Sequence, residues 1–246
     1  MRVLLVENDA VVARGISLML RSADMITDVA ATGEETLELA SLYDYDIVVL
    51  DSMLSDMEGC DVIRRLRSAR IETPVLVLCG LSGAQPRVRA LSSGADDVLN
   101  KPFDPQELMA RIQAIVRRSR GFSQPTLVVG PLSLNIGARQ ARVNGQMVPL
   151  TGKEYAILEL LTLRKGMALS RDVFLNHLYG GIDEPEGKII DVFVCKLRRK
   201  LADAGADGLI GTHWGSGYVL REVRAPMLQP FSTSAQALPA VPSLAA

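Results

Sequence analysis

Three short apolar runs within the first 80 positions constrain the fold of this chain more than any other feature. They are Val3–Val6, Ile47–Leu50 and Val75–Leu78. Acidic, glycine or proline residues flank these runs, which is typical of parallel strands buried on both faces. Weaker runs and amphipathic stretches alternate with them: further strands are expected at Thr27–Ala30 and Asp97–Leu99, and helices at Val11–Arg21, Gly33–Leu42, Gly59–Ala69 and Asp104–Arg118. This alternation predicts an α/β fold with a doubly wound parallel sheet of five strands, whose sites lie at the carboxyl ends of the strands.

The pattern changes after a short polar stretch, residues 119–125, which we interpret as a linker between domain 1–118 and domain 126–223. Beyond it we expect strands at Leu127–Val129, Leu132–Leu134 and Ala141–Val143, helices at Thr151–Leu163, Ser170–Leu178 and Glu186–Leu201, and a hairpin at His213–Leu220. The second domain is therefore α+β. Residues 224–246 are rich in Pro, Ala and Ser and show no periodicity, so we expect a disordered tail.

Composition excludes several classes of protein. The chain has 27 basic and 28 acidic residues, so any nucleic-acid surface must arise from local segregation of charge. The three cysteines are far apart in sequence and form no CxxC pair, which disfavours a disulfide framework or a zinc site. No apolar stretch approaches the length of a membrane span or a signal peptide. We expect a soluble cytoplasmic protein without membrane contact.

Polar residues follow several of the expected strands at the point where each ends. Glu7, Asn8 and Asp9 follow the first strand, Asp51 follows the third, and Lys101 follows the last. Carboxylates at the mouth of a parallel sheet suit Mg²⁺, and an aspartate held there can attack a phosphoryl group while a lysine neutralises its charge. The alternative is that the acidic and amide side chains only cap the helices that follow. The coincidence at three strand ends favours the phosphoacceptor site.

Several long motifs carry a resemblance to a known family. MRVLLVEND, YDYDIVVLDSML, GADDVLNKPF and ELMARIQAIVRRS resemble the receiver domain of OmpR/PhoB-family two-component response regulators. LTGKEYAILELLTLRKGMALSRDVFLNHLYGG and DEPEGKIIDVFVCKLRRKL resemble one branch of that family, the alphaproteobacterial cell-cycle regulators. The resemblance implies a CheY-like receiver joined to a C-terminal winged helix-turn-helix. It further implies that Asp51 is the phosphoacceptor, that Lys101 contacts the phosphate, and that Glu7, Asp51 and the Met53 carbonyl bind Mg²⁺.

The chain departs from the family pattern around this site. Asn8 stands where a second acid normally binds Mg²⁺, which removes one negative charge from the metal site. Cys79 replaces the hydroxyl residue that senses phosphate, Val98 replaces the aromatic switch residue, and Ser55 replaces a proline. Two hypotheses stay open: a receiver phosphorylated by a histidine kinase with weakened Mg²⁺ binding, or a pseudo-receiver that dimerises without phosphate and without Mg²⁺.

The resemblance also implies a dimer face on the fourth helix, fifth strand and fifth helix. The matching charge pairs are Arg87 with Glu107, Asp97 with Arg111, and Asp96 with Arg118. Glu107, Arg111 and Arg118 recur at helical spacing and therefore share one face. The alternative is an ordinary solvated face, but complementary rows of charge can fix the register of a homodimer.

Basic residues concentrate in the expected helix near Glu186–Leu201. They are Lys188, Lys196, Arg198, Arg199 and Lys200, opposite an apolar face of Ile189, Ile190, Val192, Val194, Leu197 and Leu201. Such a helix can enter the major groove of double-stranded DNA, although a basic solvated face would look the same. The resemblance assigns groove contacts to Lys188, Phe193, Cys195, Lys196, Arg198 and Arg199, phosphate contacts to Thr151 and Lys153, and the wing to Thr212, His213 and Ser216. Ser216 replaces an arginine, and we expect Trp214 and Tyr218 to pack the wing.

The sequence therefore predicts a transcription regulator that binds repeated DNA half-sites as a homodimer. A histidine kinase or phosphotransfer protein and RNA polymerase are the further partners that the resemblance implies. An aspartyl-type phosphatase is the rival from another class, but Met53 stands where such an enzyme needs a second aspartate, so we expect no enzyme. A protein-interaction adaptor would require the basic helix to be idle.

Overall fold

The computed structural model describes residues 1–80, 84–180 and 185–221. Its N-terminal part is a parallel sheet with strand order β2-β1-β3-β4-β5. The strands are β1 (Arg2–Val6), β2 (Ile26–Ala30), β3 (Ile47–Asp51), β4 (Val75–Cys79) and β5 (Asp97–Asn100). The helices are α1 (Ala10–Ser22), α2 (Gly33–Leu42), α3 (Gly59–Ser68), α4 (Gln85–Ser92) and α5 (Pro105–Ser119). The predicted doubly wound sheet is confirmed.

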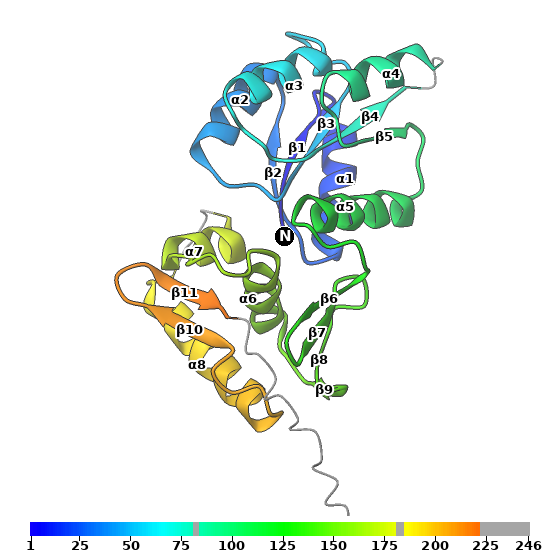
Figure 1. The fold of residues 1–246 in the computed structure, drawn as a ribbon. Helices are drawn as coiled ribbons and strands as arrows, with labels where there is room; N and C mark the ends of the chain where they lie inside the picture. The colour runs from blue at the N-terminus through cyan, green and yellow to red at the C-terminus, as the bar shows by residue number, and fades with distance from the viewer. Residues whose placement is uncertain (81–83, 181–184, 222–246) are drawn as a thin grey trace, which may run out of the picture.

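Alternate side chains of each strand point to opposite layers of the sheet. In β1, Val3 and Leu5 join the cluster that includes α1 and α5, whereas Leu4 and Val6 join the cluster that includes α3 and Ala90 of α4. Figure 1 shows α1 and α5 on one side of the sheet and α2, α3 and α4 on the other. Burial on both faces explains why these strands are continuous apolar runs.

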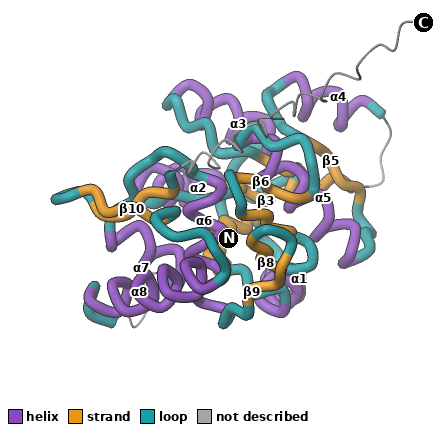
Figure 2. Tube along the Cα trace, turned by 60° about the horizontal axis from the view of Figure 1, so that its bottom comes forward, coloured by secondary structure: helices purple, strands orange, loops and turns teal. Residues whose placement is uncertain are grey.

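The C-terminal part begins with an antiparallel sheet of strand order β6-β7-β8-β9. Its strands are β6 (Thr126–Val129), β7 (Leu132–Asn135), β8 (Gln140–Val143) and β9 (Gln146–Val148). Then follow α6 (Gly152–Leu163), α7 (Arg171–Tyr179), α8 (Lys188–Asp203) and a hairpin of β10 (Ile210–His213) and β11 (Gly217–Leu220). Three helices with a terminal hairpin are the predicted winged-helix arrangement. Figure 2 shows α8 at one edge of the molecule, with α3 and α4 at the opposite edge.

Local signals place the helix starts. Asp9, Thr32, Asp104, Thr151 and Ser170 each accept a backbone hydrogen bond at the start of α1, α2, α5, α6 and α7. Thr151 and Glu154 form a reciprocal capping box, which satisfies two backbone donors that the helix itself leaves free. Thr151 therefore caps α6, in addition to the phosphate contact that the resemblance assigns to it.

Three elements differ from the expectations. Helix α4 has only eight residues with a proline near its start, so its periodicity was too short to predict. Strand β9 was not predicted, and the terminal hairpin begins at Ile210, three residues earlier than expected. The predicted tail, 224–246, lies outside the described residues. Within the described part of the chain, no helix is long and apolar enough to cross a membrane.

Candidate functional site

The carboxyl edge of the parallel sheet brings three predicted residues together. Lys101 Nζ lies 2.6 Å from Glu7 Oε2 and 2.8 Å from Asp51 Oδ2, so one ammonium group bridges both carboxylates. The Glu7 side chain is 2% exposed and that of Asp51 is 13% exposed. Burial disfavours the charged lysine, but the hydrogen bonds that Lys101 donates to both carboxylates outweigh it and raise the pKa of Lys101. The lysine therefore stays charged beside the acceptor position.

The other oxygens of these two carboxylates accept backbone amides, and Asp51 also accepts the Ser52 hydroxyl at 3.4 Å. The second oxygen of Asp51 accepts the Met53 amide at 3.3 Å, and that of Glu7 accepts the Asp9 amide at 3.1 Å. Asp9 itself caps α1 by accepting the amides of Val11 and Val12, as the capping alternative predicted for that residue. Asn8 lies between them and is exposed.

The donor set fits Mg²⁺, which proteins often hold by only one or two carboxylates together with waters. Glu7 and Asp51 supply the carboxylates, and the Met53 carbonyl and the Asn8 amide are neutral oxygens. With Lys101 between the two acids, the cluster of these three side chains carries a net charge of −1 (two carboxylates, one ammonium). An acid in place of Asn8 would double that negative charge. No group of three or more His, Cys, Asp or Glu side chains suited to a metal occurs among the described residues.

The two expected switch positions lie beside the same edge. Cys79 ends β4 and is 1% exposed. Burial raises the pKa of its thiol, so the group remains a neutral S–H, which is a weak hydrogen-bond donor. Val98 in β5 is partly buried against the cluster on the α3 side of the sheet. Residues 81–83, which follow β4, lie outside the described residues.

The second site is the outer surface of α8. Lys188, Cys195, Lys196 and Arg199 are exposed on it, whereas Ile190, Val194, Leu197 and Leu201 are buried. This is the amphipathic arrangement that the sequence predicted, with one correction. Val192 was expected on the apolar face, but it is 46% exposed, because its position turns it toward the basic surface. Phe193 is only partly buried and packs against the core.

Comparisons with known proteins identify the family of both parts of the chain. The family model of the response regulator receiver domain matches residues 3–113, and that of the C-terminal domain of transcriptional regulatory proteins matches residues 145–220. The cell cycle response regulator CtrA of Brucella anthropi is 54% identical over 92% of this chain and 98% of that protein. CtrA of Brucella abortus has the same identity and coverage. The chain belongs to the OmpR/PhoB family of response regulators.

Solved structures of the family include the response regulator DrrB, an OmpR/PhoB homologue of Thermotoga maritima. It is 26% identical, covers 89% of this chain and 98% of its own, and has a TM-score of 0.44. The family matches and the identity to CtrA, by contrast, show that the chain is a CtrA-like DNA-binding response regulator of a two-component system. Receiver domains of this family generally bind Mg²⁺ at the acceptor site.

The six charged residues expected on the dimer face of this response regulator lie on α4, β5 and α5 or next to them. Arg111 donates to Asp97 at 2.6 Å and to Glu107 at 2.7 Å within the same chain. Asp96 accepts the Val75 amide at 2.8 Å. Arg87 and Arg118 are exposed. Each of the three expected pairs thus contains a residue that already has a contact inside one protomer.

The wing is tied to α8 by side chains. Arg198 donates to the Ile210 carbonyl at 2.9 Å and to Thr212 Oγ1 at 2.8 Å, so its guanidinium joins the helix to the hairpin. Tyr218 is buried in the wing and donates to Asp191 at 2.7 Å, as its predicted packing role requires. Hydrogen bonds from Arg171 and Tyr218 lower the pKa of Asp191.

The tip of the wing corrects another expectation. Trp214 was expected to pack the wing, but it is 92% exposed, because it occupies the tight turn between β10 and β11 where no core lies within reach. His213 and Ser216 are exposed beside it, as is Thr212. At the start of α6, Thr151 caps the helix and Lys153 lies 3.8 Å from the centre of the Tyr179 ring.

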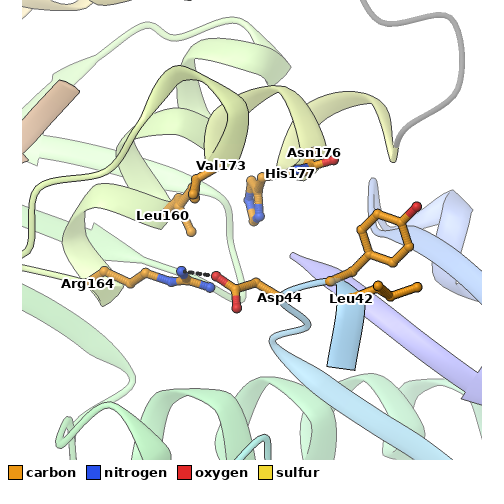
Figure 3. Close-up of a pocket in the computed structure, with 8 residues that line it drawn as sticks. Leu42, Asp44, Leu160, Arg164, Val173, Asn176 and His177 are labelled. Atoms are coloured by element: carbon orange, nitrogen blue, oxygen red, sulfur yellow. Dashed lines mark hydrogen bonds and ion pairs between the residues drawn. The ribbon is translucent and has the colours of Figure 1, made fainter. Parts of the chain in front are cut away.

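Sequence reasoning missed a polar cluster between the two domains. Arg164 at the end of α6 lies 3.1 Å from Asp44, and His177 of α7 lies 3.6 Å from Asp46 (Figure 3 shows Arg164, Asp44 and His177). Burial, together with the nearby Met1 amino group, lowers the pKa of His177 to about 3. The only sequence signal was the pair of acids flanking Tyr45 before an apolar strand, and nothing in the sequence indicates their partners.

Proposed function

We propose that this response regulator controls transcription as a receiver-mediated homodimer on repeated DNA half-sites, and that its output does not require phosphate on Asp51. We assign the receiver to residues 1–118, the linker to 119–125 and the DNA-binding domain to 126–223. The family membership supports the DNA-binding role, and the local chemistry at Cys79 and Val98 supports the independence from phosphate.

The observation that carries the proposal is the loss of the phosphate readout. A receiver signals when a donor next to the acceptor bonds the phosphoryl oxygens and a neighbouring ring changes its position. Cys79 offers a buried neutral thiol, which is a poor donor, and Val98 has no ring to move. A phosphoryl group on Asp51 would therefore make nearly the same contacts in the inactive and the active conformation of the receiver. A group that interacts equally with both conformations does not shift the equilibrium between them.

The chemistry of transfer is better preserved than its readout. The Asp51 carboxylate can attack a phosphoryl donor, and Lys101 is placed to neutralise the charge that develops on the transferred oxygens. A bound Mg²⁺ would supply further neutralisation of the negative charge on the phosphoryl oxygens. Glu7, Asp51 and the Met53 carbonyl would hold that ion, with weaker affinity than in relatives because Asn8 is neutral. Hydrolysis at Asp51 would be slow self-dephosphorylation, so the protein is no enzyme.

The DNA surface consists of α8 and the wing. Lys188, Cys195, Lys196 and Arg199 are exposed and free to reach base edges and phosphates in the major groove, with Phe193 and Arg198 at the margin. Thr151 and Lys153 approach the phosphate backbone at the start of α6, and Thr212, His213 and Ser216 approach the adjacent groove. Ser216 has no positive charge, so the wing contributes less affinity than an arginine would.

We assign dimerisation to the α4–β5–α5 face. Arg87, Glu107 and Arg118 are exposed there, and Arg111 can exchange its internal partner Asp97 for the same residue of a second copy. Asp96 is 38% exposed and can meet Arg118 of the second copy. A cytoplasmic location, RNA polymerase, and a histidine kinase or phosphotransfer protein complete the proposal.

A second candidate is a regulator that phosphorylation drives through a functional Asp51. The intact contact between Lys101 and Asp51 favours it, because that contact is needed for transfer. The two candidates differ in whether phosphate on Asp51 changes dimerisation.

Restoring the family residues tests the proposal. Acetyl phosphate and Mg²⁺ should tighten the dimer of the triple variant Asn8→Asp, Cys79→Thr and Val98→Tyr, whereas they should leave dimerisation of the unmodified protein unchanged. Asn8→Asp alone serves as the matched control, since it restores the metal charge without the readout. A strong response of the unmodified protein, equal to that of the triple variant, would overturn the proposal.

A further inference from the structure

The two domains of the chain meet at the amino-terminal ends of the parallel strands, on the side of the sheet away from Asp51. Asp44 and Asp46 lie just before β3, and Met1 precedes β1. Helices α6 and α7 of the DNA-binding domain cover this edge, with Arg164 and His177 pointing into it (Figures 1 and 3). A cavity of about 180 Å³ remains between them.

The polar groups of this interface pair across the domains; Arg164, Asp46 and His177 are largely buried, whereas Asp44 is exposed. Arg164, only 10% exposed, lies 3.1 Å from Asp44 and 3.9 Å from Asp46. Asp46, 3% exposed, also accepts the Arg2 amide at 2.8 Å. Burying the charges of Arg164 and Asp46 is costly unless each keeps a partner, so separating the domains here would require water to reach both groups.

Further contacts between the two domains surround the ion pair of Arg164 with Asp44. Arg139 of the DNA-binding domain lies 3.4 Å from Asp24 of the receiver. Gly180, which ends α7, approaches Ile26 of β2 so closely that an added Cβ would lie 2.8 Å from its methyl group. Apolar residues of α1 and α5 and those of the DNA-binding domain form one continuous cluster. The interface thus combines apolar contact with buried ion pairs.

This arrangement leaves both functional surfaces open at the same time. Lys196 and Arg199 on α8 are exposed, and so are Arg87 and Glu107 on the opposite domain. The interface between the domains therefore covers neither the DNA-binding surface of α8 nor the expected dimer face. It fixes the direction of α8 relative to the receiver.

We infer that Arg164, Asp44, Asp46 and His177 form a latch that joins receiver and DNA-binding domain into one rigid unit, so that a receiver dimer presents its two recognition helices at one fixed spacing. The latch involves no residue of the acceptor site. It acts whether or not Asp51 carries phosphate.

Reversing one exposed charge of the latch tests the inference. In the full chain, Asp44→Arg places a cation against Arg164 and the nearby Arg120, while its own side chain, 71% exposed in the wild type, can be replaced without disturbing a core. We expect the single calorimetric unfolding transition of the wild type to split into two, and the radius of gyration in solution scattering to rise. Asp44→Glu should behave as the wild type.

The matched control is Asp61→Arg. Asp61 is also exposed and also pairs with an arginine, Arg64, at 2.6 Å, but within the receiver. The Asp61→Arg variant should keep a single unfolding transition and the radius of gyration of the wild type. A single transition with unchanged radius in Asp44→Arg, or two transitions in the wild type, would overturn the latch. If Asp44→Arg fails to fold by circular dichroism, Arg164→Gln must give the split instead.

The fixed spacing has its own readout. Selection from a random-sequence duplex pool should return paired half-sites at one spacing with the wild type and at several spacings with Asp44→Arg. The same single spacing for both proteins would contradict the inference. Recovery of no paired half-sites with the wild type would instead contradict the proposed dimeric function, so the two failures are distinguishable.

Discussion

At the scale of single residues, His177 shows how burial decides the charge of a group. It is 6% exposed and lies between the Met1 amino group, at 3.4 Å, and Asp46, at 3.6 Å. Desolvation and the positive charges of Met1, Arg164 and Arg2 outweigh the attraction of Asp46 and lower the pKa of His177 to about 3. The imidazole is therefore neutral at neutral pH.

A lowered histidine pKa makes stability depend on pH in one direction. The unfolded chain takes up a proton near pH 6.5, while the folded chain does so only near pH 3, so stability is lost as pH falls through this window. From pH 7 to pH 5 the wild type should lose about 2 kcal/mol more than His177→Gln in urea unfolding. His213 is present in both proteins and cancels. Equal losses in the two proteins would show that His177 does not titrate as described.

At the scale of elements, α8 and the wing act together through Arg198. Its hydrogen bonds to Ile210 and Thr212 hold the hairpin against the helix, whereas its neighbour Arg199 is exposed. The two adjacent arginines therefore have different roles, although the sequence assigns both to the groove.

Substituting each arginine separates these roles. Arg199→Ala should weaken DNA binding by about 1–3 kcal/mol and leave the wing unchanged. Arg198→Ala should loosen the wing before DNA is added, because two of its anchoring hydrogen bonds are lost. The single tryptophan of the chain, Trp214, lies at the wing tip, so its fluorescence anisotropy reports that motion. Equal anisotropy in the two variants would contradict the anchoring role of Arg198.

The sequence predicts elements well where periodicity is long. The five parallel strands and the long helices follow from apolar runs and caps such as Asp9 and Thr151. Short elements such as α4 and β9 cannot be predicted in this way, because they contain too few residues to show a periodicity. Side chains at the ends of elements are also hard to place: Trp214 was expected to pack the wing, but it lies in the turn at the wing tip and is exposed.

At the scale of the whole molecule, the acceptor residues could be predicted and the domain interface could not. Glu7, Asp51 and Lys101 meet because the carboxyl ends of parallel strands lie at one edge of the sheet. The strand pattern of the sequence is therefore enough to predict that these residues lie together. Arg164 and Asp44 are 120 residues apart and meet only because two domains dock in one orientation. No local pattern encodes that orientation.

In the proposed mode of action, the receiver governs dimerisation and DNA binding without phosphate on Asp51. The most direct measurement treats the wild type and Asp51→Ala with acetyl phosphate and Mg²⁺, then follows dimerisation by sedimentation and affinity for a duplex selected by the wild type. We predict that neither quantity changes by more than about twofold in either protein, which is less than 0.5 kcal/mol on the rough scale of tenfold per 1.4 kcal/mol. An acyl-phosphate that forms on the wild type and tightens dimer and DNA binding, and that Asp51→Ala abolishes, would contradict the account.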